Sequence, residues 1–103
     1  MPLFTIRRML PGATREDLDA AGLRATVCAY EFPGLRWVRS YWDRPAGEVL
    51  CLYQAKDTAQ IEEHSRRARI PCDEVREVVI LGPGEVDGDA GTFVDAGAVN
   101  VRG

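Results

Sequence analysis

A chain of 103 residues, of which 46% are hydrophobic and 28% charged, is long enough for one globular domain with a core of its own. Its formal net charge of −3 argues against a nucleic-acid partner, because such partners are attracted by an excess of basic residues. The longest apolar run falls far short of the roughly 20 residues that cross a bilayer, so we expect no membrane partner.

A strand and a helix are predicted first. Apolar and polar residues alternate over residues 3–10, and Pro11 and Gly12 end this strand. Thr14 then has the position of a helix N-cap, with Asp17 as its capping-box partner, and we expect the helix to run to about residue 31. Its inward stripe contains mostly small residues: Leu18, Ala21, Gly22, Ala25, Cys28 and Ala29. A wider apolar arc indicates a second contact surface, for the C-terminal tail or a partner subunit: Leu23, Val27 and Tyr30.

A β-hairpin and a second helix follow. Residues 35–43 and 48–55 have the composition of strands joined by a short turn. The register of this hairpin is open by one residue, and a one-residue slip exchanges the two faces, so the face of Cys51 is left open. Asp57 is the predicted N-cap of the second helix, with Gln60 as its capping-box partner. The inward stripe of this helix contains Ile61, His64, Ser65 and Ala68.

A last strand over residues 74–81 completes the order β-α-β-β-α-β, which predicts an α+β, ferredoxin-like split βαβ sandwich. Such a fold has a four-stranded antiparallel sheet with two helices on one face. The other face exposes large aromatic side chains, so we expect a homodimer that joins two sheets into a dimeric α/β barrel. Residues 1–82 form this domain. Residues 83–103 are expected to be a Gly-rich C-terminal tail, in which residues 92–94 and 98–101 either add a short extra strand, clasp a neighbouring chain or belong to a loose tail.

The only histidine and two of the three cysteines are the candidate metal ligands. On its inward stripe, His64 is either a core histidine with one hydrogen bond, or a metal ligand or general base. Cys51 lies within a strand and Cys72 at a helix–strand junction, and both thiols and imidazole suit nickel, zinc or copper. His64, Cys51 and Cys72 make no local motif, so a metal site requires separate elements or two subunits to converge. An odd number of unpaired cysteines favours free thiols in a reducing, cytoplasmic setting.

A cationic side chain among aromatic residues is the second candidate site. Alternation along the strand places Trp37, Arg39 and Tyr41 on one face. An arginine among aromatic rings can bind a carboxylate or an enolate, or stack on a flat ligand. With Tyr53, these residues are the candidate ligand-binding residues of an apolar pocket for a flat acidic molecule. The alternative is an arginine at the sheet edge that lies over aromatic rings without a ligand.

Three segments, WVRSYWD, VLCLYQAKD and IEEHSRRARIPCDEVREV, resemble segments of a family of small ferredoxin-like proteins of unknown function that are often described as nickel-binding. The resemblance covers about residues 35–78, and Tyr41, Cys51, His64 and residues 71–78 match it. It implies the ferredoxin-like fold, a homodimer and a nickel or other divalent transition-metal cofactor. Histidines that some relatives carry are absent here, and arginines occupy their neighbourhoods: Arg7, Arg8 and Arg39. This added positive charge favours an anionic or organic ligand.

Three functions are compatible with these residues. The first is a small homodimeric binding protein for a transition metal or a compact ligand, which uses His64 and Cys51 with Tyr41 nearby. The second is a cofactor-free dimeric-barrel enzyme, an oxygenase, cyclase or isomerase that acts on an aromatic or polyketide-like acid. His64, Arg39 and Tyr41 are its candidate catalytic residues. The third is a structural dimer without a ligand.

Overall fold

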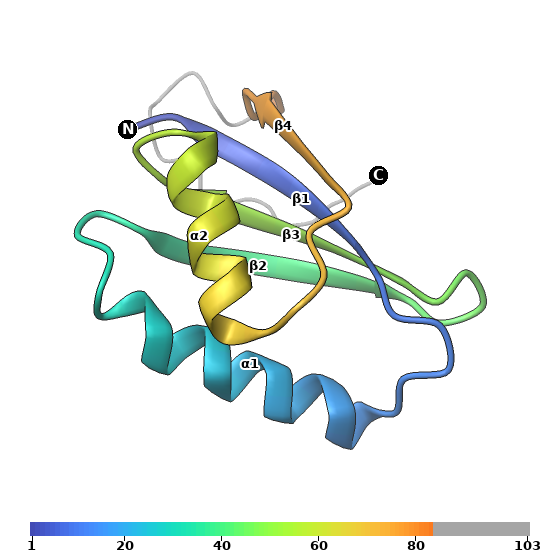
Figure 1. The fold of residues 1–103 in the computed structure, drawn as a ribbon. Coiled ribbons are helices and arrows are strands. Elements are labelled where there is room, and N and C mark those ends of the chain that lie inside the picture. The colour runs from blue at the N-terminus through green and yellow to red at the C-terminus, as the bar shows by residue number, and fades with distance from the viewer. Residues whose placement is uncertain (84–103) are drawn as a thin grey trace.

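The structure, a computed structural model, describes residues 1–83. Its elements follow in the order β1 (Leu3–Met9), α1 (Arg15–Ala29), β2 (Arg36–Asp43), β3 (Glu48–Gln54), α2 (Thr58–Ala68) and β4 (Glu74–Val78). The strands form one antiparallel sheet in the order β2-β3-β1-β4. Both helices lie on the same face of the sheet (Figure 1). The predicted α+β architecture, a four-stranded antiparallel sheet with two helices on one face, is therefore confirmed. The extra strand predicted in the C-terminal tail lies outside the described residues.

Each helix begins at a side chain that caps its first turn. At α1 the Asp17 amide donates to Thr14 Oγ1 over 3.1 Å, and the Thr14 amide donates to Asp17 Oδ2 over 2.9 Å, which is the predicted capping box. At α2 the Gln60 amide donates to Asp57 Oδ1 over 2.8 Å, as predicted. The predicted hydrogen bond from the Asp57 amide back to the Gln60 side chain is wrong. Gln60 Oε1 instead accepts from the amide of Lys56, the residue before the N-cap, over 2.8 Å.

The described elements end earlier than four of the predictions, and one of them is β3, which ends at Gln54 and not at residue 55. The first strand ends at Met9 and not at residue 10, and the first helix ends at Ala29 and not at residue 31. The last strand ends at Val78 and not at residue 81. The reason for the last difference is register: within residues 1–83 β4 pairs only with β1, and Val78 lies opposite Leu3, where β1 begins. Neither described helix is long and apolar enough to span a membrane.

The hydrophobic core lies between the sheet and the two helices. The inward stripe predicted for α2 is buried as a whole, whereas α1 contributes mainly small, partly buried residues. The buried core cluster contains Phe4, Ile6, Leu35, Val49, Cys51, Tyr53, Ala55 and Ile61.

A bulge in β2 decides which of its side chains face the helices. Trp37 pairs with Tyr53, and Arg39 pairs with Leu52, the neighbour of Tyr53 in β3. Between these two pairs β2 therefore advances by two residues and β3 by only one. Trp37 therefore shares the helix-covered face with Tyr53, whereas Arg39 and Tyr41 lie on the helix-free face. The interpretation that placed these three residues of β2 on one face is wrong for this reason. Cys51, whose face was open, lies on the helix-covered face.

Candidate functional site

Arg8 lies on the helix-covered side of β1, and only 2% of it is exposed. Its Nε donates to Cys51 Sγ over 3.3 Å, and its Nη1 donates to Ser65 Oγ over 2.9 Å and to the Pro71 carbonyl oxygen over 2.6 Å. Its Nη2 has no hydrogen-bond partner, and the side chain forms no ion pair, within residues 1–83. A buried guanidinium is thus held by neutral acceptors from three parts of the chain.

A buried cation of this kind is energetically costly. An arginine side chain keeps its proton in proteins, so Arg8 cannot avoid the cost by losing its charge. Removing an ion from water costs several kcal/mol even after the surroundings relax, and a buried donor without a partner adds roughly 1–3 kcal/mol. Neutral acceptors offset only part of this cost. The surroundings of Arg8 therefore favour the approach of an anion.

A line of hydrogen bonds continues from Arg8 across the sheet to its edge strand. Ser40 Oγ donates to Cys51 Sγ over 2.9 Å, and Trp37 Nε1 donates to Ser40 Oγ over 2.8 Å. The Trp37 ring stacks on Tyr53 with ring centroids 6.4 Å apart and planes 13° from parallel. These contacts orient Trp37 and make the Cys51 sulfur the acceptor of two donors, one of them a cation.

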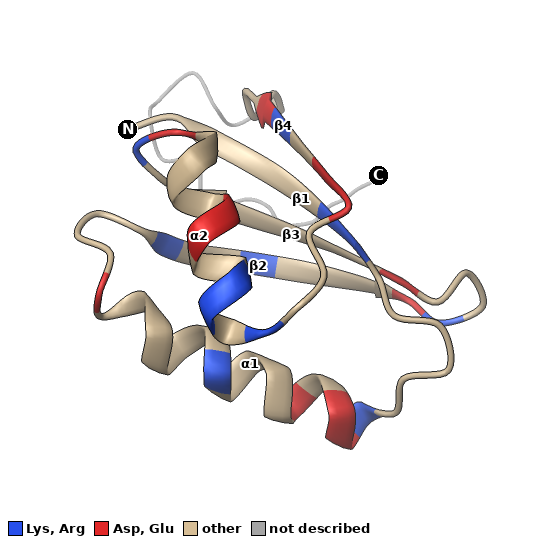
Figure 2. Ribbon diagram, viewed as in Figure 1, with Lys and Arg blue, Asp and Glu red and all other residues tan. Residues whose placement is uncertain are grey.

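A pocket of about 310 Å³ lies between α1 and the sheet, and Arg8 contributes to its lining. Among the other lining residues, Arg15 and Asp19 form an ion pair of 2.9 Å at the start of α1, where Figure 2 shows acidic and basic positions side by side. Their charges compensate each other, so Arg8 is the uncompensated charge of the pocket among the described residues. The walls are mainly apolar and include Ala21, Gly22, Ala25, Trp37, Trp42 and Tyr53.

Two aromatic side chains near Arg8, Tyr53 and His64, have pKa values that differ from their ordinary ones. Burial raises the pKa of Tyr53 to about 12, although the Arg8 guanidinium acts in the opposite direction, so Tyr53 stays neutral. The His64 ring lies near both Tyr53 and Phe32, with ring centroids 5.6 Å apart in each case. His64 Nε2 donates to the Ala25 carbonyl over 2.9 Å, since a carbonyl oxygen only accepts. Burial lowers the pKa of His64, with the Ala25 hydrogen bond opposing it, so this ring is a neutral link between α2 and α1.

The predicted metal ligands are not gathered into a cluster. Within residues 1–83, no three His, Cys, Asp or Glu side chains are placed to hold a metal ion. His64 is 1% exposed and bonded through Nε2, Cys51 accepts from the Arg8 guanidinium, and Cys72 is a half-buried free thiol between α2 and β4. A guanidinium beside a thiol repels a divalent cation. The described residues around Cys51 therefore do not fit nickel.

Two of the four predicted ligand-binding residues, Trp37 and Tyr53, line the pocket, whereas Arg39 and Tyr41 lie on the other side of the sheet. The cation that accompanies the aromatic rings is therefore Arg8, from a different strand. One sequence signal pointed to it: a basic residue interrupts the inward face of the first strand, which otherwise reads Phe4, Ile6 and Leu10.

The three candidate catalytic residues are also separated. His64 is on the buried side of α2, on the helix-covered face of the sheet. Arg39 and Tyr41 lie on the helix-free face, so the sheet stands between them and the imidazole. Within one chain these residues do not line a common pocket.

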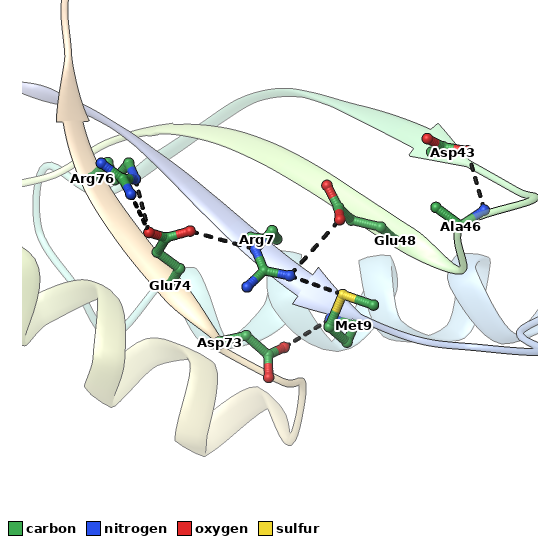
Figure 3. A network of polar contacts seen from close by, with 8 residues as sticks. All are labelled: Arg7, Met9, Asp43, Ala46, Glu48, Asp73, Glu74 and Arg76. Atoms are coloured by element: carbon green, nitrogen blue, oxygen red, sulfur yellow. Dashed lines mark hydrogen bonds and ion pairs between the residues drawn. The ribbon is translucent and has the colours of Figure 1, made fainter.

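The helix-free face carries a network of charged side chains that joins β1, β3 and β4 (Figure 3). Arg7 Nε donates to Glu74 Oε1 over 3.4 Å, and Arg7 Nη1 lies 3.8 Å from Glu48 Oε1 and donates to Met9 Sδ over 3.1 Å. Arg76 Nε donates to Glu74 Oε2 over 2.8 Å. These groups are partly exposed, so the network contributes little to stability. The β2–β3 side of the same face carries Tyr41, Leu50 and Leu52.

The fold and the pocket define a small α+β domain with a ligand-sized space between one helix and the sheet. The chain belongs to the family of nickel responsive SCO4226-like proteins, because the model of that family matches residues 4–78. This confirms the resemblance found in the sequence. The crystal structure of SCO4226 from Streptomyces coelicolor A3(2) is similar, with a TM-score of 0.70 and 20% sequence identity over 78% of this chain and 99% of that chain. At this identity the likeness concerns the fold. No curated protein matches the sequence.

Proposed function

We propose that this chain is a small binding protein that holds a compact anionic ligand in the pocket beneath α1. The observation that carries the proposal is the buried guanidinium of Arg8, which lines the pocket and has no ion pair within residues 1–83. An anion at the inner end of the pocket supplies the missing counter-charge, and apolar walls screen the attraction only weakly. Nη2 is closed to water, so it bonds directly to the anion only after a small shift of the pocket wall.

Nickel is the competing ligand, because the family is described as nickel responsive. Its ligands would be His64, Cys51 and Cys72. Two of these are engaged otherwise: His64 Nε2 by the Ala25 carbonyl, and the Cys51 sulfur by Arg8 and by a serine hydroxyl. The positive charge of Arg8 supports the anion over the metal.

We also propose that the chain is a homodimer in which two helix-free faces meet and enclose a dimeric α/β barrel. No described helix covers that face, and its β2–β3 side carries the apolar side chains of Tyr41, Leu50 and Leu52. The pocket lies on the opposite side of the sheet, next to α1. Dimerisation and ligand binding therefore use separate surfaces and can be tested separately.

The anion proposal is tested by measuring how much a ligand stabilises two variants that each lose one positive charge. Thermal unfolding is followed in millimolar acetate, benzoate, phosphate or nickel chloride, for the wild type, Arg8→Gln and Arg39→Gln. A ligand at 100 times its Kd stabilises a protein by about 2.7 kcal/mol, which raises the Tm of a small domain by roughly 10 °C or more. We expect an anion to raise the Tm of the wild type and of Arg39→Gln, whose arginine is on the helix-free face, but not of Arg8→Gln.

The outcomes separate the two ligands. A wild-type Tm that no anion raises, or a shift that persists in Arg8→Gln, contradicts the proposal. A shift caused by nickel alone and lost in His64→Gln supports the metal. Arg8→Gln also removes donors to Ser65 and Pro71, so its circular dichroism is recorded first. Arg8→Lys is the second variant: it keeps the charge without the forked geometry, and we expect it to lose most of the shift.

A further inference from the structure

The pocket lining narrows the class of anion, on the condition that the proposed function holds. The polar groups at the strand side of the pocket include Arg8, Ser40 and Cys51, and the last two are already joined by a hydrogen bond. The charges of Arg15 and Asp19 compensate each other. One uncompensated cation matches one negative charge, so a second carboxylate or a multiply charged oxyanion finds no further counter-charge among the described lining residues.

Aromatic rings form much of the sheet side of the pocket. Trp37 lies nearly parallel to Tyr53, and Trp42 lies farther along the same face of β2. Rings pack favourably against other rings in offset or edge-to-face geometry. An inorganic anion would leave these apolar walls in contact with water. A ligand with a flat apolar body covers them.

Small residues of α1 form the opposite wall of the pocket, and at Gly22 this wall meets the Trp37 ring, so the space for such a body lies beside that contact. Ala21, Gly22 and Ala25 of α1 line the pocket, and a methyl group on Gly22 would lie only 3.3 Å from Trp37 Cη2. The distance between α1 and the Trp37 ring is therefore sensitive to one added carbon. For comparison, an apolar cavity with a volume of about 150 Å³ holds benzene. The volume of the present pocket, about 310 Å³, is roughly twice as large.

We propose that the ligand is a monocarboxylic acid with a flat apolar body of one or two fused rings. Its carboxylate lies at the Arg8 end of the pocket, and its rings lie against the aromatic side chains of β2, in the part of the pocket beside the contact between Gly22 and Trp37. Charge, ring contact and volume support this class together, since an acid without a ring fills too little of the pocket and a neutral ring leaves Arg8 without an anion.

Binding of a matched set of probes tests the ligand class: 2-naphthoate, its neutral analogue 2-naphthamide, acetate and inorganic phosphate. Calorimetry gives the affinities, and the two indole N–H signals in a ¹⁵N–¹H NMR spectrum locate the ligand, because both tryptophans of the chain line the pocket. We expect naphthoate to shift both signals, and the other three probes to bind at least about tenfold more weakly, since each lacks either the buried charge or the buried ring.

Two variants of α1 make the test specific. Gly22→Ala narrows the space beside Trp37 and favours the helix, so we expect a folded protein with naphthoate affinity lowered about threefold or more. Leu23→Ala changes the exposed side of the same helix and is expected to bind like the wild type.

The results distinguish this inference from the function on which it rests. Acetate or phosphate binding as tightly as naphthoate, and lost in Arg8→Gln, overturns the ligand class but leaves the anion-binding function in place. Naphthamide binding as tightly as naphthoate, or naphthoate binding unchanged in Arg8→Gln, overturns both. Absence of binding by every probe at millimolar concentration also overturns both. Naphthoate binding that is unaffected by Gly22→Ala contradicts the proposed position of the rings.

Discussion

His64 combines complete burial with a titratable ring, and this makes the stability of the fold depend on pH. Its Nε2 links α2 to the Ala25 carbonyl of α1, and its pKa is lowered from the ordinary value of 6.5 mainly by burial. The unfolded chain therefore takes up a proton at this position before the folded chain does. The contribution of His64 to folding stability is fully present at a pH well above 6.5 and decreases as the pH falls through that value, until folded His64 is also protonated.

We expect the unfolding free energy of the wild type to decrease between about pH 7.5 and 5.5, and to decrease less in His64→Gln. Urea denaturation at several pH values measures both. The pKa values of Glu63 and Glu74 are held below their ordinary 4.5 by hydrogen bonds from Arg66 and Arg76, so their contributions are lost only at lower pH. Equal pH dependence of the two proteins over this window contradicts a buried, neutral His64.

Helical periodicity was sufficient to place single residues on α2 but not on β2. The sequence put His64 on an inward stripe, and the structure buries it there, because a regular helix fixes which residues share a face. On β2, one bulge puts Trp37 and Arg39 on opposite faces of the sheet. Nothing in the alternation of apolar and polar residues marks the position of this bulge. The state of Arg8 depends on neighbours up to 63 residues away in the chain, which a local pattern does not contain.

The C-terminus of α2 contains an unfavourable backbone conformation. Arg69 caps this helix with φ 59° and ψ 48°, and it is the one non-glycine residue with positive φ in the described part of the chain. Glycine adopts this conformation without a steric penalty, whereas other residues lose roughly 1 kcal/mol or more. The Arg24 side chain bonds to the Arg69 carbonyl, which a side-chain replacement leaves in place.

We expect Arg69→Gly to raise the unfolding free energy by about 1 kcal/mol, or the Tm by about 4 to 8 °C for a domain of this size. The same replacement inside the helix is the control: Glu62→Gly, at an exposed position, should lower stability by about 1 kcal/mol because glycine weakens a helix interior. Both are measured by thermal and urea denaturation. A destabilised Arg69→Gly would show that its side chain matters more than its backbone conformation.

The elements themselves were largely predictable from the sequence, and their ends less so. Thr14 and Asp57 start the helices where capping chemistry predicts, since these side chains satisfy amides within the same turn. The end of β4 was placed three residues too late, because a strand stops where its partner stops, and Leu3 of β1 is far away in sequence. Local side-chain chemistry therefore determines where the two helices begin, whereas pairing with a distant strand determines where β4 ends.

At the scale of the whole molecule, the sheet separates two surfaces with different properties. One side holds the helices (Figure 1). The pocket with Arg8 is on the same side, between α1 and the sheet. The other side carries the charged network of β1, β3 and β4 and the apolar residues of β2 and β3. A second apolar surface is found on the outer side of α1, where Leu23, Val27 and Tyr30 are exposed. The proposed dimer uses the helix-free face, and a dimer through the outer side of α1 is the alternative from which an experiment distinguishes it.

The same substitution on the two surfaces identifies the interface. Tyr41 on the helix-free face is 57% exposed and Tyr30 at the end of α1 is 88% exposed, so glutamate at either position leaves the core intact. A carboxylate buried without a partner costs several kcal/mol. By light scattering we expect the wild type and Tyr30→Glu to have twice the chain mass of 11.4 kDa, and Tyr41→Glu to have that of one chain. A monomeric wild type excludes the dimeric barrel, and a dimer broken by Tyr30→Glu but not by Tyr41→Glu assigns the interface to α1.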